Sequence, residues 1–164
     1  MTDFDAPGAP AILAPDVQQA VWFLGSLVRV RVGSDATAGQ LAVLEHQGHR
    51  GYSAPVHTHD ADEETFFVID GELRVEVDSE AFTAGSGAAA FLPRRRPHSF
   101  VVTSARARFL TLHTPAGFDR FTLAAGTPAT DFATPPTAAP PDPAALAALA
   151  AGYGIEIIGP PPTP

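Results

Sequence analysis

The amino-acid sequence predicts an all-β protein, a β-sandwich or β-barrel built from about seven or eight short strands. Two observations predict this fold class. Short runs rich in β-branched and aromatic residues recur between residues 21 and 118, and turn signals separate them. No strongly helical segment precedes the C-terminal region, which argues against an α/β fold.

The strand pattern begins after an N-terminal arm. Residues 1–20 carry Pro7, Pro10 and Pro15 with little periodic pattern, so we expect an arm that either lies over the domain or is partly mobile. Valine then alternates with arginine over residues 28–32, the period of two that marks a half-buried strand. Further strand-like runs follow at residues 41–46, 65–69, 73–77, 88–92, 99–103 and 108–113.

The clearest turn signal is Asp70-Gly71, which lies between two strand-like runs. An Asp-Gly pair tolerates the positive φ angles that a tight hairpin requires. The sequence therefore predicts that residues 65–69 and 73–77 form one antiparallel pair.

The pattern changes after Phe118 to a Pro- and Thr-rich stretch that we expect to be a linker. Asp142 and Pro143 can cap and start a short helix, and a glycine after the alanine-rich turns can end it. Isoleucines in residues 155–158 then add a strand or pack on the body. The predicted organisation is an arm (1–20), a β domain (21–118) and an extension of linker, short helix and strand (119–164).

Charge and composition argue against several function classes. Acidic residues outnumber basic ones by 18 to 10, and the formal charge of −8 repels nucleic acid and anionic membrane surfaces. We therefore expect neither as a partner. The chain contains no cysteine, which excludes disulfides, thiolate nucleophiles and Cys-ligated metals. Any metal must be bound through nitrogen and oxygen.

The sequence contains no recognisable secretory signal or membrane span, so we expect a cytoplasmic protein. Residues 1–16 lack both the basic and the apolar region of a secretory signal. The longest apolar stretch, around residues 20–28, is too short to span a bilayer.

One histidine-containing segment carries the candidate chemistry. His57 and His59 are two residues apart, so in a strand both side chains point to the same face. Glu64 follows a short acidic loop, where an antiparallel return brings its carboxylate towards the imidazoles. His98 completes a set of three imidazoles and one carboxylate. Such a set suits one divalent transition metal: iron(II), manganese, nickel, copper or zinc.

Two segments resemble the motifs of the cupin superfamily. The chain from Gly51 to Gly71 is similar to the first motif, G-x5-H-x-H-x3/4-E-x6-G, at every fixed position. The chain from Gly87 is similar to the second, G-x5-P-x-G-x2-H-x3-N, but Arg95 replaces the inner glycine and Val102 the asparagine. Neither position is a metal ligand in that family. The resemblance implies a double-stranded β-helix, or jelly-roll barrel, with metal ligands His57, His59, Glu64 and His98.

Some assignments stay open at this level. Glu63 competes with Glu64 because the first motif allows three or four residues before the glutamate. Only Glu64 leaves six residues before Gly71, so we prefer it. His46 and His113 end strand-like runs, but their faces cannot be assigned from the sequence.

Strand periodicity also predicts the lining of the site. Phe66 and Val68 follow Glu64 at two-residue intervals, and Phe100 and Val102 follow His98 in the same way. These four side chains would form an apolar substrate pocket, which suits a flat organic ligand that chelates through adjacent oxygens. The alternative, equally weighted, is that they are sandwich core.

Among cupins, the sequence resembles small single-domain proteins of the quercetin 2,3-dioxygenase-like group, in the run 57–72 and in the ending 153–160. This resemblance implies an enzyme, a metal-dependent dioxygenase, that opens a flavonol with dioxygen. Glu64 would be both ligand and the catalytic base. The expected partners are a small aromatic or enolic substrate, dioxygen, and a second copy in a homodimer. The alternatives are a non-oxidative metal cupin, such as a polyketide cyclase or isomerase, and a non-catalytic cupin that binds a small ligand.

Overall fold

The computed structural model describes residues 9–137 and 139–164. Residues 1–8 of the expected arm lie outside the described residues, and residues 9–19 form neither strand nor helix. The strands are β1 (Ala20–Phe23), β2 (Ser26–Val32), β3 (Ala42–His49), β4 (Ser53–His59), β5 (Glu63–Asp70), β6 (Glu72–Val77), β7 (Glu80–Gly85), β8 (Ala89–Leu92), β9 (His98–Val102), β10 (Arg106–Thr114), β11 (Thr127–Pro128) and β12 (Ile155–Ile157). The helices are α1 (Phe118–Ala125) and α2 (Pro143–Ala151).

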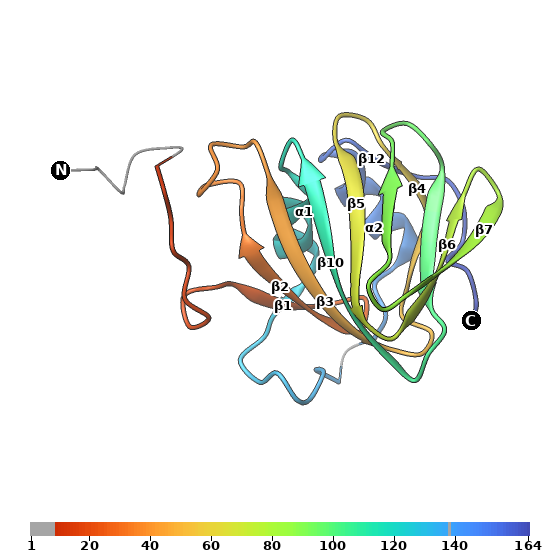
Figure 1. Ribbon diagram of the computed structural model, residues 1–164, viewed down its shortest axis with the longest axis horizontal. Coiled ribbons are helices and arrows are strands. Elements are labelled where there is room, and N and C mark those ends of the chain that lie inside the picture. The colour runs from red at the N-terminus through yellow and green to blue at the C-terminus, as the bar shows by residue number, and fades with distance from the viewer. Residues whose placement is uncertain (1–8, 138) are drawn as a thin grey trace.

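The strands form two antiparallel sheets (Figure 1). One has seven strands in the order β11-β1-β2-β3-β10-β5-β8, and the other has five in the order β12-β4-β9-β6-β7. The predicted all-β class is therefore confirmed, with the double-stranded β-helix arrangement that was expected. Across residues 9–137 and 139–164, no helix combines the length and apolar character needed to traverse a bilayer.

The core lies between the inward faces of the two sheets, and its chemistry changes along the strands. In β10, Ala107 and Phe109 point inward, and Phe109 stacks on Phe66 of β5 with ring centroids 5.7 Å apart. Full burial of one such phenylalanine contributes about 2–3 kcal/mol to folding. Further along the same inward face of β10 come Thr111 and His113, both buried. One end of the sandwich is therefore an apolar core, and the other end holds buried polar side chains.

The predicted hairpin at Asp70-Gly71 is wrong. The flanking strands β5 and β6 lie in different sheets: β5 pairs with β10 and β8, whereas β6 pairs with β7 and β9. Gly71, with φ of 85°, instead crosses between the sheets. The Asp-Gly pair correctly marks a sharp turn, but long-range pairing with other strands decides the partner of each flanking strand.

The region after Phe118 is not entirely linker as predicted, because α1 occupies residues 118–125. Its inward face includes Phe121, whose ring packs against Phe23 of β1 at 5.7 Å. The buried carboxylate of Asp119 accepts hydrogen bonds from the backbone N–H of Ser34 at 2.7 Å and from its hydroxyl at 2.6 Å. Phe118, Phe121 and Thr122 follow the i, i+3, i+4 spacing of one helix face, a pattern that a search for the two-residue repeat of strands does not detect.

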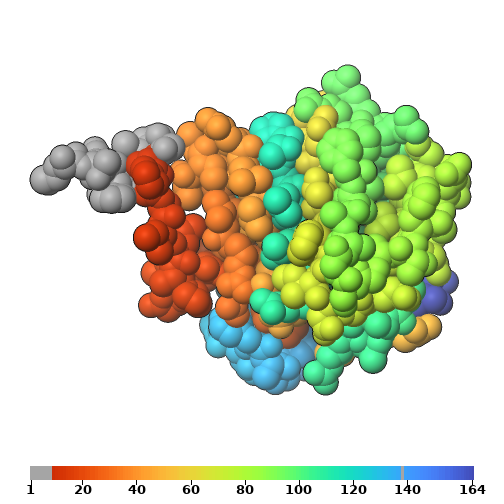
Figure 2. Space-filling view, in the orientation of Figure 1, coloured from red at the N-terminus to blue at the C-terminus, as the bar shows by residue number. Residues whose placement is uncertain are grey.

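The predicted C-terminal helix is α2. The carboxylate of Asp142 accepts a hydrogen bond from the N–H of Ala145 at 3.1 Å, and Pro143 takes the first helical position. The expected strand that follows is β12, which adds to the edge of the five-stranded sheet beside β4. Residues 129–137, which follow β11, lie below β1 and β2 in the view of Figure 2.

Candidate metal centre

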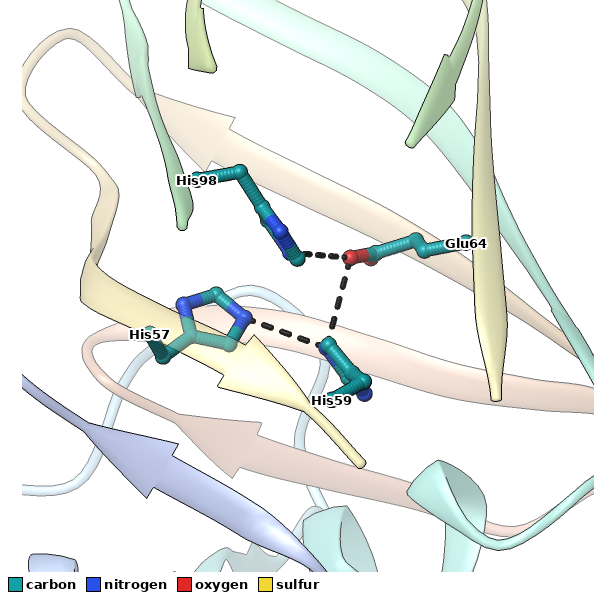
Figure 3. A group of neighbouring side chains, drawn as sticks. All are labelled: His57, His59, Glu64 and His98. Carbon is teal, nitrogen blue, oxygen red and sulfur yellow. Dashed lines mark hydrogen bonds and ion pairs between the residues drawn. The ribbon is translucent and has the colours of Figure 1, made fainter. Parts of the chain in front are cut away.

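Four buried side chains from three strands converge at the polar end of the sandwich (Figure 3). His57 Nε2 lies 3.1 Å from His59 Nε2, and His98 Nε2 lies 3.1 Å from Glu64 Oε2. The ligand atoms of all four residues lie within 4.8 Å of one another. The structure thus brings together every side chain predicted from the sequence as a metal ligand.

Strand geometry explains this convergence. The imidazoles of His57 and His59 share one face of β4 because they are two residues apart. His98 begins β9 directly opposite His57 in the antiparallel ladder. Glu64 comes from β5 in the other sheet, so the cluster joins the two sheets.

The hydrogen bonds at the outer nitrogens determine what the inner nitrogens can bind. The Nδ1 atoms of His57 and His98 lie 2.7 and 2.9 Å from the carbonyl oxygens of Pro55 and Arg96, and Nδ1 of His59 lies 3.0 Å from a carboxylate oxygen of Asp62. Carbonyl and carboxylate oxygens only accept, so each Nδ1 donates, and each Nε2 is left as the atom that binds either a proton or a metal. Three Nε2 atoms and a carboxylate oxygen that converge need a cation between them, and this nitrogen and oxygen donor set fits a divalent metal.

Electrostatics within the cluster favour an ionised carboxylate. Burial favours the neutral acid, but the imidazoles of His113, His59 and His98 hold the pKa of Glu64 well below its usual range. Burial, together with the neighbouring His98 and His59, lowers the pKa of His57 to about 3. Hydrogen bonds to Asp62 and Glu64 outweigh burial and raise the pKa of His59 to about 9. A proton and a metal therefore compete for the same Nε2 atom of His59.

The two candidate glutamates have different positions. Glu64 is buried within the cluster. Glu63 is half-exposed on the opposite face of β5, where its carboxylate pairs with Arg94 at 3.2 Å. The motif spacing to Gly71 therefore selected the glutamate that faces the histidines.

A family profile described as "Cupin domain" matches residues 44–113. Over these residues the chain is similar to the cupin domain, and its two sheets have the cupin fold. The matched range runs from β3 to β10 and includes all four clustered side chains.

A curated protein that is similar to this chain is quercetin 2,3-dioxygenase of Bacillus subtilis (strain 168), which is 26% identical over 102 residues. The match covers 62% of this chain and 30% of the relative, so it spans less than a third of that protein's length.

Solved cupin structures resemble the fold. KdgF from Halomonas sp. aligns with a TM-score of 0.60 and 17% identity, over 68% of this chain and 99% of that chain. The polyketide cyclase RemF from Streptomyces resistomycificus aligns with a TM-score of 0.54 and 23% identity, over 64% and 79%. At these identities the likeness establishes the cupin double-stranded β-helix and leaves the activity open.

The turn before His98 departs from the second cupin motif in sequence but keeps a special backbone conformation. Arg95 stands at the usual glycine position and has φ of 63°, the left-handed region that glycine occupies at little cost. Its N–H donates to the carbonyl of His59 at 2.8 Å. The turn is therefore attached to the end of β4, which carries two of the clustered histidines.

Two further residues lie beside the cluster: Asp62, which the sequence did not single out, and His113, whose face could not be assigned from the sequence. Asp62 bridges two imidazoles: one carboxylate oxygen lies 3.0 Å from His59 Nδ1 and the other 2.8 Å from His113 Nδ1. His113 is fully buried, and its Nε2 lies 3.5 Å from Oε1 of Glu64. His113 lies four residues after Phe109 in β10, so both side chains point to the same face of that strand. The sequence does not show that this face is turned towards the metal cluster; the pairing of β10 with β5, which places His113 opposite Glu64, does.

A cavity of about 40 Å³ opens beside His57 and Glu64. Of the predicted pocket residues, Phe100 lines it, whereas Phe66, Val68 and Val102 pack in the apolar core. The two-residue repeat correctly predicted that these side chains point inward. It does not predict how far along the strand, and so how far from the metal cluster, each one lies. The cavity is lined by Phe23, Leu24, His46, Tyr52, Ala54, Pro55, His57, Glu64, Phe100, Phe118, Phe121, Leu146, Ile155 and Ile157.

The polar groups on the cavity wall are fixed by hydrogen bonds. His46 Nδ1 lies 2.9 Å from the hydroxyl of Tyr52, and His46 Nε2 lies 3.0 Å from the hydroxyl of Thr111. Burial lowers the pKa of His46 to about 3 and raises that of Tyr52 above its usual range. Both side chains are therefore neutral, and the cavity wall carries no charged side chain outside the ligand set.

Proposed function

We propose that this protein is a metal-dependent dioxygenase of the quercetin 2,3-dioxygenase type, acting on a flavonol or a similar aromatic or enolic substrate. The observation that carries the proposal is a three-histidine, one-glutamate cluster that opens directly onto an apolar, aromatic-walled cavity. The similarity to a quercetin 2,3-dioxygenase supports the same chemistry.

Each clustered residue has a role in this proposal. His57, His59, His98 and Glu64 would hold one divalent iron, manganese, nickel, copper or zinc ion. When bound, that metal supplies a Lewis acid and a template for the hydroxyl and carbonyl oxygens of the substrate. Glu64 would accept the proton of the substrate hydroxyl; its pKa lies well below the usual range, so the carboxylate is ionised and free of a proton of its own.

The cavity lining favours the substrate class. Phe100, Phe118 and Tyr52 present aromatic surfaces to the cavity that His57 lines, and none of the lining residues is a lysine or an arginine. A phosphate or a sugar carboxylate would have no cationic partner on these walls, whereas a flat neutral ring system would gain from apolar burial.

A second candidate is a non-oxidative metal cupin, a cyclase or an isomerase, in which the metal serves only as Lewis acid. The fold similarity to the polyketide cyclase RemF favours keeping it. A third is a cupin that binds a small ligand without turnover. We place the protein in the cytoplasm in all three cases.

Metal analysis combined with oxygen uptake tests the proposal. The purified protein is stripped, reloaded with each candidate metal, and mixed with a flavonol while dissolved oxygen and flavonol absorbance are recorded. We expect stoichiometric oxygen consumption coupled to flavonol bleaching. Turnover that continues without oxygen would instead establish the non-oxidative enzyme, and tight binding without turnover would establish the ligand-binding cupin.

A further inference from the structure

The cavity beside the metal cluster is too small for the ligand class that its walls favour. Its volume is about 40 Å³. That is room for a few water molecules, whereas pockets that bury organic ligands measure about 300–1,000 Å³. If the proposed function holds, one wall must move before an aromatic substrate can reach the metal.

Most of the walls are held in place by backbone ladders or buried polar contacts. The walls from β4 and β9 belong to the five-stranded sheet, and β12 is joined to β4 through the pairs Ile155–His59 and Ile157–His57. Helix α1 is anchored by the buried carboxylate of Asp119, which accepts two hydrogen bonds from Ser34.

Helix α2 lacks such attachments. Its nine residues are only proline, alanine and leucine, so no side chain of the helix can form a polar contact with the body. Ala150 is its one buried side chain, and Leu146 is half-buried. The residues on its N-terminal side, 139–142, are exposed, and Gly152 and Gly154 follow its C-terminal end. The carbonyl of Gly154 accepts a hydrogen bond from the N–H of Asp60 at 2.8 Å and so belongs to the anchored side. Gly152, between the helix and this anchored point, is suited to act as a hinge.

Leu146 is the α2 side chain that reaches the cavity. Leu149, one turn further along the same helix, is 36% exposed and does not line it. In Figure 1, α2 lies beside β12 and α1, which supply the neighbouring cavity walls.

We propose that α2 is the mobile wall of the metal-site cavity and that Leu146 is its specificity-determining residue. Outward movement of α2 admits flat, uncharged aromatic or enolic chelators to the metal. In the closed position, Leu146 fills the space that such a ring system would occupy. This inference rests on the proposed function for its substrate class.

Two measurements on the metal-loaded full chain test the gate, and neither uses turnover. The first is amide hydrogen exchange without ligand. We expect the α2 amides to exchange at least about tenfold faster than those of α1, because opening of α2 breaks few buried contacts. Protection of α2 equal to that of α1 would overturn the proposal.

The second measurement follows binding of 4-nitrocatechol to the cobalt(II)-loaded protein by absorbance. Leu146→Ala should accelerate association about tenfold, and Leu149→Ala, the same substitution in the same helix, should leave it within about twofold. Equal effects of the two substitutions, or no effect of either, would show that Leu146 does not gate access. If Leu146→Ala accelerates binding but the protein does not oxidise flavonol, the role of α2 and Leu146 in access to the metal is supported and only the dioxygenase proposal fails.

Discussion

Asp62 is the residue that links the metal cluster to its surroundings. Its two carboxylate oxygens each accept a hydrogen bond from a buried imidazole, one from His59 and one from His113. The bond to His59 sets the tautomer in which Nε2 faces the metal position. Such a contact orients a ligand and also increases its basicity.

Asp62→Asn should weaken metal binding about 10–100-fold while the fold is retained, because the amide can accept from only one of the two imidazoles. Competition titration with a chromophoric chelator gives the affinity. Asp60→Asn is the matched control, since Asp60 lies in the same loop and its side chain is 76% exposed. If the Asp62→Asn protein bound metal with unchanged affinity, Asp62 would have no role in orienting the metal ligands.

At the scale of elements, Gly71 allows the chain to cross from β5 to β6 between the sheets. Its φ is 85°, and a Cβ atom there would lie 2.2 Å from the carbonyl oxygen of Arg106 in β10. Gly87, the first residue of the second motif, has φ of 86° but no atom within 4 Å of the same position. A side chain at Gly71 would therefore meet both backbone strain and steric overlap, whereas a side chain at Gly87 would meet backbone strain alone.

Gly71→Ala should lower the free energy of unfolding by at least about 2 kcal/mol, since it adds overlap with backbone to the left-handed strain. Gly87→Ala should cost about 1 kcal/mol, the strain alone. Urea denaturation of both variants measures the difference. Equal losses would mean that the crossing shifts to accommodate the methyl group.

Glu45 of β3 joins three strands on the outer face of the seven-stranded sheet. Its carboxylate accepts hydrogen bonds from Arg31 of β2 at 2.6 Å and from Arg108 of β10 at 3.0 Å. Burial alone would raise the pKa of Glu45, but the bonds from Arg108 and Arg31 bring it from 4.5 to about 2.

A carboxyl group whose pKa is lower in the folded state stabilises the fold above its unfolded pKa. The stability advantage of wild type over Glu45→Gln should therefore be constant above pH 4.5 and shrink as the pH falls towards 2. Denaturation of both proteins across this range is the measurement. A difference that does not change with pH would show that Glu45 keeps its ordinary pKa.

At the scale of the whole molecule, the metal cluster connects the two sheets. His57, His59 and His98 belong to the five-stranded sheet and Glu64 to the seven-stranded sheet. A bound ion would hold the sheets together at the end of the sandwich where the core is polar. Its binding free energy would then add to the stability of the entire fold.

Metal at about 100 times its Kd should stabilise the protein by about 3 kcal/mol and raise Tm by about 5–10 °C. Thermal unfolding with and without a chelator tests this. His98→Ala should bind little metal, and its Tm should not respond to the chelator. A chelator response that survives in His98→Ala would place the ion elsewhere.

The predicted homodimer is a property of the whole molecule that the single chain does not test. Exposed sheet edges offer unpaired backbone groups to a second copy. Light scattering should give twice the chain mass of 17.1 kDa. A mass equal to one chain would contradict the prediction.

The sequence by itself determined the local features of this protein. Alternation of side chains identified the strands, and motif spacing placed His57, His59, Glu64 and His98 in one cluster. The two-residue repeat of a strand directly decides that His57 and His59 share a face. The motif spacing supplied Glu64 and His98, and its distance to Gly71 distinguished Glu64 from Glu63, which are adjacent in sequence and point in opposite directions.

Only the tertiary structure decided which strands are partners and what fills the space beside the metal cluster. The Asp70-Gly71 turn has the local chemistry of a hairpin, yet its strands enter different sheets because each finds partners far away in sequence. Phe66, Val68 and Val102 share the inward face with Phe100, but depth in the sandwich separates them from the cavity. Further walls of the cavity come from α1, α2 and β12, because long-range packing, which local periodicity does not encode, folds the C-terminal extension over the site.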